Sequence, residues 1–181
     1  MRIPDWTPQE HPQDPALVQQ VLTRRGGQLL NLDKALLWSA PVTTGWHAYF
    51  QHVRHGLSVS RKLSELGICT VALLTGAHYE YHHHAPDFLK AGGTEEELAA
   101  LQQAVHNAPC QGVSSPVLGP LNSVVVQFAA QMTLNIEIDD AVFTALRSHL
   151  STTEVVELST VIASYNMVAR LLVALQIQPE N

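Results

Sequence analysis

The chain carries most of its recognisable chemistry in one stretch, Tyr79-Glu80-Tyr81-His82-His83-His84-Ala85-Pro86-Asp87-Phe88. An apolar segment with one acid, Glu65, precedes this stretch. Glu80 and His84 are four residues apart, so they share one face of a helix. Glu65 can join them only if the chain turns back between the two segments, and Thr75-Gly76 is where such a turn fits. The sequence therefore predicts a Glu65/Glu80/His84 cluster at a helix–helix junction, either as a proton-transfer site or as a metal site.

The composition favours a globular protein that associates with itself. The 181 residues are enough for one domain with a buried core. Only 14% of the residues are charged, against about 25% in an average soluble domain, and so little charge favours a homo-oligomer. The net charge of −6, without a basic run, argues against nucleic acid as a partner.

The hydropathy, the N-terminus and the two cysteines of the chain indicate where the protein is found. No unbroken apolar run of about 18 residues stands out, so we expect no membrane span. The N-terminus is polar and rich in proline, unlike a signal peptide, and a cytoplasmic protein is expected. Cys69 and Cys110 make no disulfide framework, and Cys69, inside an apolar helical run, is interpreted as a small core residue.

Helical spacing of apolar residues runs through most of the chain and predicts an all-α fold. Residues 1–15, which hold four of the ten prolines, are expected to form an extended arm, and residues 16–181 a single helical domain. No segment alternates convincingly as a strand. The predicted helices cover residues 15–25, 31–37 (capped by Asn31 or Asp33), 41–57, 60–75, 77–91, 94–104, 120–134, 139–150 and 152–175, with a loop over 106–119.

Four blocks of sequence resemble the carboxymuconolactone decarboxylase family, which shares its fold with alkyl hydroperoxidase D. They are Leu63-Ser-Glu65-Leu-Gly-Ile-Cys-Thr-Val-Ala72, Gly76-Ala-His-Tyr79-Glu80-Tyr-His-His-His84, Ala91-Gly and Glu96-Glu-Leu98. The core of this resemblance covers residues 55–101, and the segment from Val156 to Leu172 is similar to the C-terminal helix of larger members. The resemblance implies a homo-oligomer, a trimer or a hexamer, with pockets near the subunit contacts.

The chain departs from the peroxidase branch of that fold at two positions. In that branch the helix after the glycine begins with a Cys-x-x-Cys pair, and a histidine four residues beyond the second cysteine relays protons to it. Here Ala77 and Glu80 stand at the two cysteine positions, while His84 keeps the relay position. Neither Cys69 nor Cys110 has the spacing to replace them. Thiol peroxidase chemistry needs a reactive thiolate, so this activity is disfavoured.

The resemblance implies instead cofactor-free acid/base chemistry on a small carboxylate or lactone, as a decarboxylation or a related lyase or isomerase step. Glu65, Glu80 and His84 are the expected catalytic residues. A neutral Glu65 or a protonated His84 would deliver the proton, and Glu80 would orient the imidazole. The core motif offers no obvious arginine for a substrate carboxylate, and the candidates are Arg54, Arg61 and Arg170.

Two other functions remain open on the sequence. A divalent metal ion could bind Glu65, Glu80 and His84, or the protein could be a non-catalytic helical oligomer that binds a metabolite. Glu65 could also be a helix-edge acid that pairs with Arg61 or Lys62. The sequence assigns no role to the other histidines near these segments, namely His52, His55, His78, His82 and His83.

Overall fold

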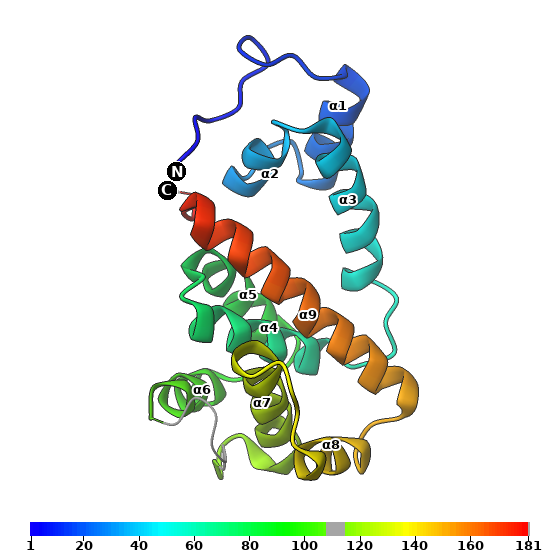
Figure 1. Cartoon of the computed structure of the whole chain (residues 1–181), viewed down its shortest axis with the longest axis vertical. Helices are drawn as coiled ribbons and strands as arrows, with labels where there is room; N and C mark the ends of the chain where they lie inside the picture. Colours follow the sequence, from blue (N-terminus) through cyan, green and yellow to red (C-terminus); the bar gives the residue numbers. More distant parts are fainter. Residues whose placement is uncertain (108–114, 181) are drawn as a thin grey trace. The chain divides into compact units, whose positions relative to one another are not determined.

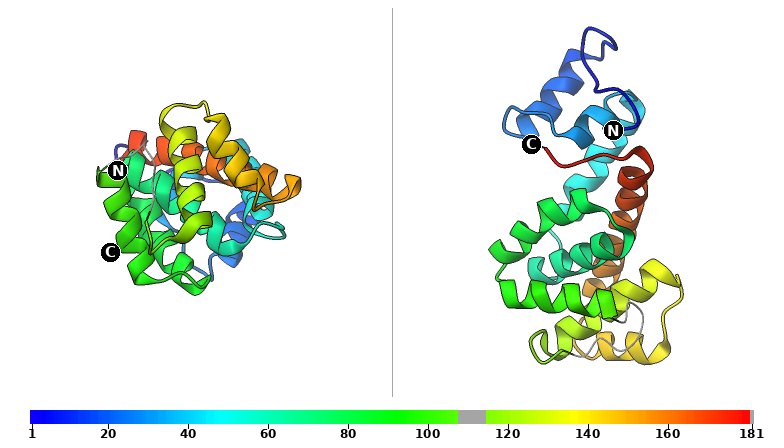
Figure 2. Two further views of the ribbon diagram at one scale, coloured as in Figure 1. Left: turned by 90° about the horizontal axis from the view of Figure 1, so that it is seen from below. Right: turned by 90° about the vertical axis from the view of Figure 1, so that its left-hand side faces the viewer.

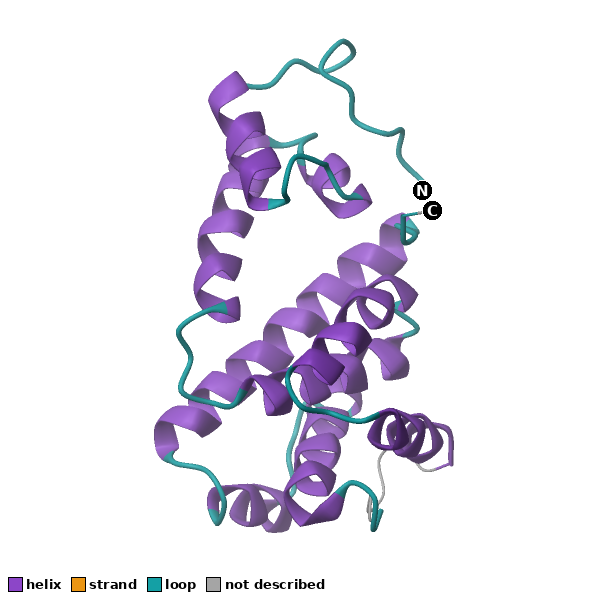
Figure 3. Cartoon of the chain, turned by 180° about the vertical axis from the view of Figure 1, so that it is seen from behind, coloured by secondary structure: helices purple, strands orange, loops and turns teal. Residues whose placement is uncertain are grey.

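The computed structural model describes residues 1–107 and 115–180, and these residues form helices joined by loops, with no strand among them (Figures 1 and 3). The all-α prediction is confirmed over this part of the chain. The backbone contacts divide the chain into two compact units, Met1–Gly56 with Leu172–Asn181, and Leu57–Leu171. Each unit is described by itself below. The division into an arm and one domain of residues 16–181 stays a prediction.

The first unit contains α1 (Pro15–Arg24), α2 (Asn31–Leu36), α3 (Ala40–Arg54) and the last residues of α9 (Thr152–Leu175). The N-terminal arm is not helical, yet its Trp6 is buried against Val21 and Leu37. The indole Nε1 of Trp6 donates a hydrogen bond to the carbonyl of His11 over 2.8 Å. The arm is therefore a packed part of this unit.

The second unit contains α4 (Arg61–Thr75), α5 (His78–Lys90), α6 (Glu95–Asn107), α7 (Gly119–Leu134), α8 (Asp140–Arg147) and most of α9 (Figure 2). Every residue of α4 from Leu63 to Ala72 is buried, and α4 packs against α5, α6 and α7. The helix α4 therefore lies at the centre of this unit, as its nearly continuous apolar sequence requires. At Gly67 the helix α4 packs so closely on α9 that a Cβ there would lie 3.1 Å from Cγ1 of Ile162.

The helix ends follow the capping signals of the sequence. The Ser60 hydroxyl accepts a hydrogen bond from the Leu63 N–H at the start of α4. Thr94 and Glu97 cap each other reciprocally over 3.0 and 3.1 Å at the start of α6. The N-cap of α2 is Leu30, whose N–H donates to Asp33 inside the helix, so neither Asn31 nor Asp33 is itself the cap. The helix α6 also ends three residues later than predicted; residues 108–114 of the predicted loop lie outside the described residues.

The turn between α4 and α5 brings the candidate residues together. Gly76 has φ +68° and ψ +21°, a left-handed conformation that glycine adopts without the Cβ penalty of other residues. The Ala77 N–H returns to the carbonyl of Ala72 over 2.9 Å and closes the end of α4. The helix α5 then runs back along α4 and packs against it.

One helix of the described chain, α9, is long and apolar enough to cross a membrane by length and composition alone. Polar residues interrupt the sequence of α9, so it contains no unbroken apolar run of about 18 residues. Half of its most apolar window is buried inside the protein, as in a core helix. The absence of membrane contact therefore stays a prediction.

Candidate functional site

The imidazole of His84 lies between two buried carboxylates. Its Nδ1 is 2.6 Å from Oε2 of Glu65, which comes from the second turn of α4. Its Nε2 is 3.0 Å from Oε2 of Glu80, one turn earlier on α5. The exposed fractions of the three residues are 0% for Glu65, 3% for Glu80 and 7% for His84. The structure thus confirms the prediction that the turn at Gly76 brings these three side chains into contact.

The two carboxylates hold His84 differently. The contact with Glu65 is a short hydrogen bond. The contact with Glu80 is a longer ion pair, with 3.0 Å between Nε2 and Oε2. Each ring nitrogen of His84 therefore faces a carboxylate oxygen.

Arg61 and Asp87 extend the cluster toward solvent. Arg61, one turn before Glu65 on α4, forms an ion pair with Oε1 of Glu65 and lies 3.8 Å from Oδ2 of Asp87. Of the two partners proposed for Glu65, Arg61 is the one observed, while Lys62 pairs with Glu97 over 2.8 Å. The side chains of Arg61 and Asp87 are 43% and 36% exposed, unlike the buried groups behind them.

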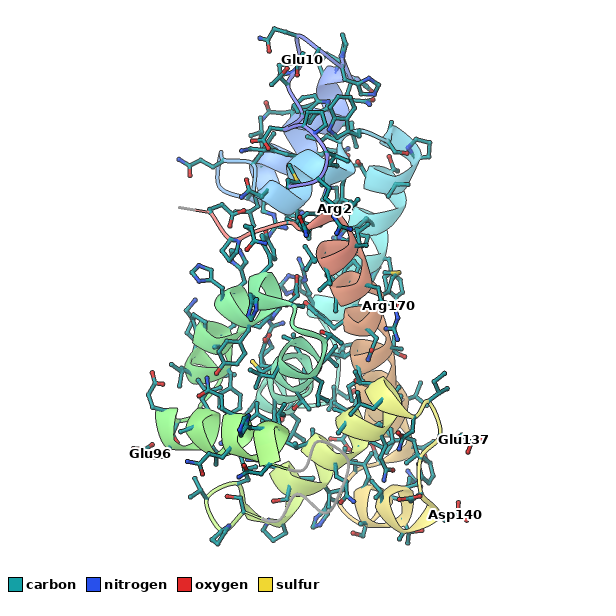
Figure 4. All side chains as sticks on the ribbon, turned by 60° about the vertical axis from the view of Figure 1, so that its left-hand side comes forward. Arg2, Glu10, Glu96, Glu137, Asp140 and Arg170 are labelled. Atoms are coloured by element: carbon teal, nitrogen blue, oxygen red, sulfur yellow. The ribbon has the colours of Figure 1, made fainter. Side chains whose placement is uncertain are left out.

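The other two candidate arginines make different contacts. Arg170 donates to the carbonyl and the side-chain oxygen of Asn166, one turn earlier on α9 (Figure 4). The guanidinium of Arg54 lies over the ring of Phe50 at 5.1 Å. Arg61 is therefore the candidate that the structure places in contact with the cluster.

Tyr165 of α9 completes the surroundings of His84. Its ring meets the imidazole edge-on, with the centroids 4.8 Å apart and the planes at 84°. Tyr79 and Tyr81, from the stretch that contains His84, make other contacts. The Tyr79 ring packs on His83, and the Tyr81 hydroxyl accepts a hydrogen bond from Gln102.

Sequence reasoning missed both Asp87 and Tyr165. Asp87 had a usable signal, because it follows His84 by three residues and so shares its helix face. Tyr165 lies 81 positions beyond His84 in the chain, and only the packing of α9 brings the two rings together.

These neighbours raise the pKa of His84 well above 6.5. Burial alone lowers this pKa, but Tyr165, the hydrogen bond to Glu65 and the nearby Glu80 raise it by more. These surroundings therefore favour the protonated form of the imidazole. Two cations, His84 and Arg61, then balance the two buried carboxylates. The result is a buried proton donor held by fixed countercharges.

The cluster does not offer one metal ion the three ligands suggested by the sequence. Glu65 and Glu80 contact opposite ring nitrogens of His84, and one ion binds only one of those nitrogens. A different trio, Glu65, His84 and Asp87, has ligand atoms within 4.8 Å of one another. However, Arg61 already pairs with Glu65 and lies beside Asp87, so a cation is supplied by the chain itself.

No cysteine of the described chain can act as a reactive thiolate at the site. Cys69 is fully buried, and burial, followed by the charges of Glu65 and Glu80, raises its pKa. Ala77 precedes α5 as its N-cap. Cys110 lies outside the described residues.

The remaining histidines of these segments lie outside the cluster. The rings of His82 and His83 contact each other, with centroids 5.2 Å apart, and His83 also packs on Tyr79. The other three candidates are exposed: His52, His55 and His78. The structure therefore gives His84 alone of these histidines a place between the carboxylates.

Solved structures of similar fold are peroxidase-related proteins. One, an uncharacterized peroxidase-related protein from Silicibacter sp. TM1040, is 20% identical with a TM-score of 0.74; the match covers 93% of this chain and 88% of that one. Another, an uncharacterized peroxidase-related protein from Ralstonia eutropha JMP134 described as an alkylhydroperoxidase AhpD core, is 14% identical with a TM-score of 0.79 and coverages of 99% and 92%. At these identities the likeness shows the fold.

A search of curated proteins returned no match. Residues 40–112 match the model of the carboxymuconolactone decarboxylase family. This range includes Glu65, Glu80 and His84, and the fold of the whole chain agrees with it. Residues 40–112 are therefore similar to the carboxymuconolactone decarboxylase family, and the chain has the AhpD-like fold.

Proposed function

We propose that the protein carries out cofactor-free acid/base chemistry on a small carboxylate or lactone, with His84 as the proton donor. The observation that supports this most strongly is the position of a buried imidazole between the carboxylates of Glu65 and Glu80, which raise its pKa. A group that is already protonated at neutral pH suits delivery of a proton to a carbanion-like intermediate.

The reaction we propose is loss of carbon dioxide from a carboxylated lactone. The carbon–carbon bond to the departing carboxylate breaks, and its electron pair moves into the conjugated lactone carbonyl to give a dienolate. His84 then gives its proton to the dienolate carbon and is reprotonated from water. In this proposal the transferred proton is the one on Nε2, the ring nitrogen that faces Glu80.

Glu65 acts in this proposal as an anion and not as an acid. Its Oε1 is paired with the guanidinium of Arg61 and its Oε2 with the imidazole of His84. Of the two proton donors that the sequence left open, His84 is thus the better supported. Glu65 fixes the Nδ1 side of the ring, and Glu80 keeps the imidazole charged.

To test this proposal, the protein is incubated with a carboxylated butenolide in deuterium oxide, and loss of carbon dioxide is measured. The product should carry one deuterium at the dienolate carbon that takes the proton. His84→Gln should lower kcat by about 10²- to 10⁴-fold, the usual contribution of a general acid. His83→Gln, next to His84 but outside the cluster, is the matched control and should keep its rate within about threefold.

The results separate the rival functions. A His84→Gln variant with the wild-type rate would refute the proton-donor role. Binding of the butenolide without turnover would favour the non-catalytic metabolite-binding protein. Activity lost on treatment with a chelator and restored by a divalent ion would favour the metal-dependent alternative.

We also propose that the protein acts as a cytoplasmic homo-oligomer, a trimer or a hexamer, without nucleic acid or membrane as partners. The low charged content supports self-association. So do exposed apolar side chains on α9, of which Val156 is 59% and Met167 46% exposed. Light scattering at micromolar concentration should give a mass of at least three chains, and a monodisperse monomer would refute this.

A further inference from the structure

The exposed side of α9 lacks the charged residues expected on a surface helix. Residues 158–169 include no charged side chain, although the solvent face of a helix in a globular protein is usually charged or polar. Half of the most apolar window of α9 is buried, so the other half is at least partly exposed on the described chain. Burial in the core therefore explains only part of this apolar sequence.

One face of α9 carries a stripe of uncharged residues, which we call the Ala163 stripe: Val156, Thr160, Ala163 and Met167. They are spaced by three and four residues and therefore share one face of the helix. Val156, Ala163 and Met167 are exposed, and Thr160 is partly exposed. The whole stripe belongs to the Leu57–Leu171 unit and extends along about 16 Å of the helix.

Opposite charges stand at the two ends of the stripe. Glu154 and Glu157 lie at its start, and Arg170, labelled in Figure 4, lies at its end. Each of these side chains hydrogen-bonds to uncharged groups, namely backbone N–H groups for the two glutamates and Asn166 for the arginine. Within the described residues, no ion pair compensates the three charges.

These end charges favour one orientation for a second copy of the chain. When two α9 helices pack antiparallel with Ala163 at the centre, residues equally far before and after Ala163 face each other. Arg170 follows Ala163 by seven residues, while Glu157 and Glu154 precede it by six and nine. Arg170 of one copy would then lie level with the segment between the two acids of the other. A parallel pair would instead bring like charges together, which is unfavourable.

We infer that the Ala163 stripe is a two-fold contact between copies of this chain, with the α9 helices antiparallel. Ala163 has the smallest side chain of the stripe and lets the two helices approach closely at the centre. The inference rests on the self-association proposed above. It selects the hexamer from the two assemblies left open, because a trimer with cyclic symmetry contains no two-fold contact.

A membrane surface fits the stripe less well than a second copy does. Helices that lie on a membrane carry lysine and arginine along their polar face, whereas the charged residues of α9 are one arginine and two glutamates. The net charge of −6 also opposes binding to anionic lipid.

Disulfide cross-linking tests the contact and its direction. Ala163→Cys should form an intermolecular disulfide in mild oxidant, because its two copies meet at the two-fold axis, within the roughly 7 Å between Cα atoms that a disulfide can span. Val156→Cys is the matched control, since an antiparallel pair holds its two copies roughly 21 Å apart along the helix axis. Both variants also carry Cys110→Ser, and Cys69 is buried.

The cross-linking result can contradict the inference in two ways. Absence of the disulfide at Ala163→Cys would overturn the contact. A disulfide that forms equally well at Val156→Cys would mean a parallel pair and would overturn the proposed orientation.

The change Met167→Glu tests the contact through the mass of the assembly. Each two-fold contact would receive two unpaired carboxylates, so association should weaken by about 30-fold or more, as for the loss of a hot-spot residue. In light scattering at micromolar concentration the hexamer should fall to trimers. Val173→Glu is the matched control, because both side chains are 46% exposed but Val173 lies roughly a quarter turn away from the stripe. Circular dichroism should show that both variants are folded.

The outcomes separate this surface from the broader proposal of self-association. A wild-type trimer, or a hexamer that Met167→Glu leaves intact, would overturn the stripe as a contact and leave the self-association standing. A wild-type dimer that Met167→Glu splits would support the stripe and refute the larger assembly. A wild-type monomer would overturn both. Flotation of the wild type with phosphatidylcholine vesicles, lost in Met167→Glu, would show a membrane on the stripe and would also overturn the inference.

Discussion

The change Glu65→Gln should destabilise the protein strongly, although it preserves the shape of the side chain. Glu65 is fully buried and holds two cations, Arg61 through Oε1 and His84 through Oε2. Glutamine still offers a carbonyl oxygen but no charge. The buried imidazolium would then rely on Glu80 alone, and this change isolates the electrostatic part of the Glu65 contribution.

The size of the effect follows from the burial of each partner. Breaking a buried ion pair by removing one member costs about 3–5 kcal/mol. Arg61 is 43% exposed and can turn to water, and His84 can release its proton, so we expect the lower end, about 3 kcal/mol at pH 7. For a chain of 181 residues, this corresponds to a fall in Tm of roughly 6–12 °C.

Chemical denaturation at several pH values measures the loss of unfolding free energy in Glu65→Gln. Because the folded pKa of His84 lies above its ordinary value of 6.5, the stability from the charged imidazole is fully present below about pH 6.5 and is lost as the pH rises through the folded pKa. The difference between the wild type and Glu65→Gln should therefore shrink in alkaline solution. Asp87→Asn, which removes a partly exposed partner of Arg61, is the control and should cost less than about 1 kcal/mol.

Two results would refute this reasoning. A loss below about 1 kcal/mol at pH 7 would mean that Glu65 is not the main countercharge of a buried cation. A difference between wild type and Glu65→Gln that stays constant up to the alkaline limit would mean that His84 is not protonated in the folded protein.

Other consequences of the structure are simpler to test. Dithiol-driven hydroperoxide turnover should stay at background, and turnover abolished by Cys69→Ser would show that the nucleophile was misplaced. Gly76→Ala should destabilise the protein by about 1–2 kcal/mol in a denaturant titration, because φ is +68° there. Gly45→Ala, in a helical position with open space, should instead stabilise it by roughly 0.5–1 kcal/mol. Equal effects at the two glycines would contradict the backbone argument. Thr94→Ala should cost about 1 kcal/mol through loss of the α6 cap, whereas unchanged thermal unfolding would mean that the cap contributes little.

The sequence by itself determined the all-α fold and the meeting of Glu65, Glu80 and His84. Helical periodicity, capping residues and a glycine in the left-handed region are local features, and each acts over a few residues. The i, i+4 spacing of Glu80 and His84 and one turn at Gly76 were enough to place three side chains together. No long-range contact had to be known for that prediction.

The tertiary structure decided what the cluster can do. Whether Glu65 and Glu80 share one side of the imidazole or take opposite nitrogens depends on the packing of α5 on α4, and this choice separates a held imidazolium from a metal trio. The contact with Tyr165 depends on α9, far along the chain. Burial and the approach of distant charges set a pKa, and neither quantity has a local signature in the sequence.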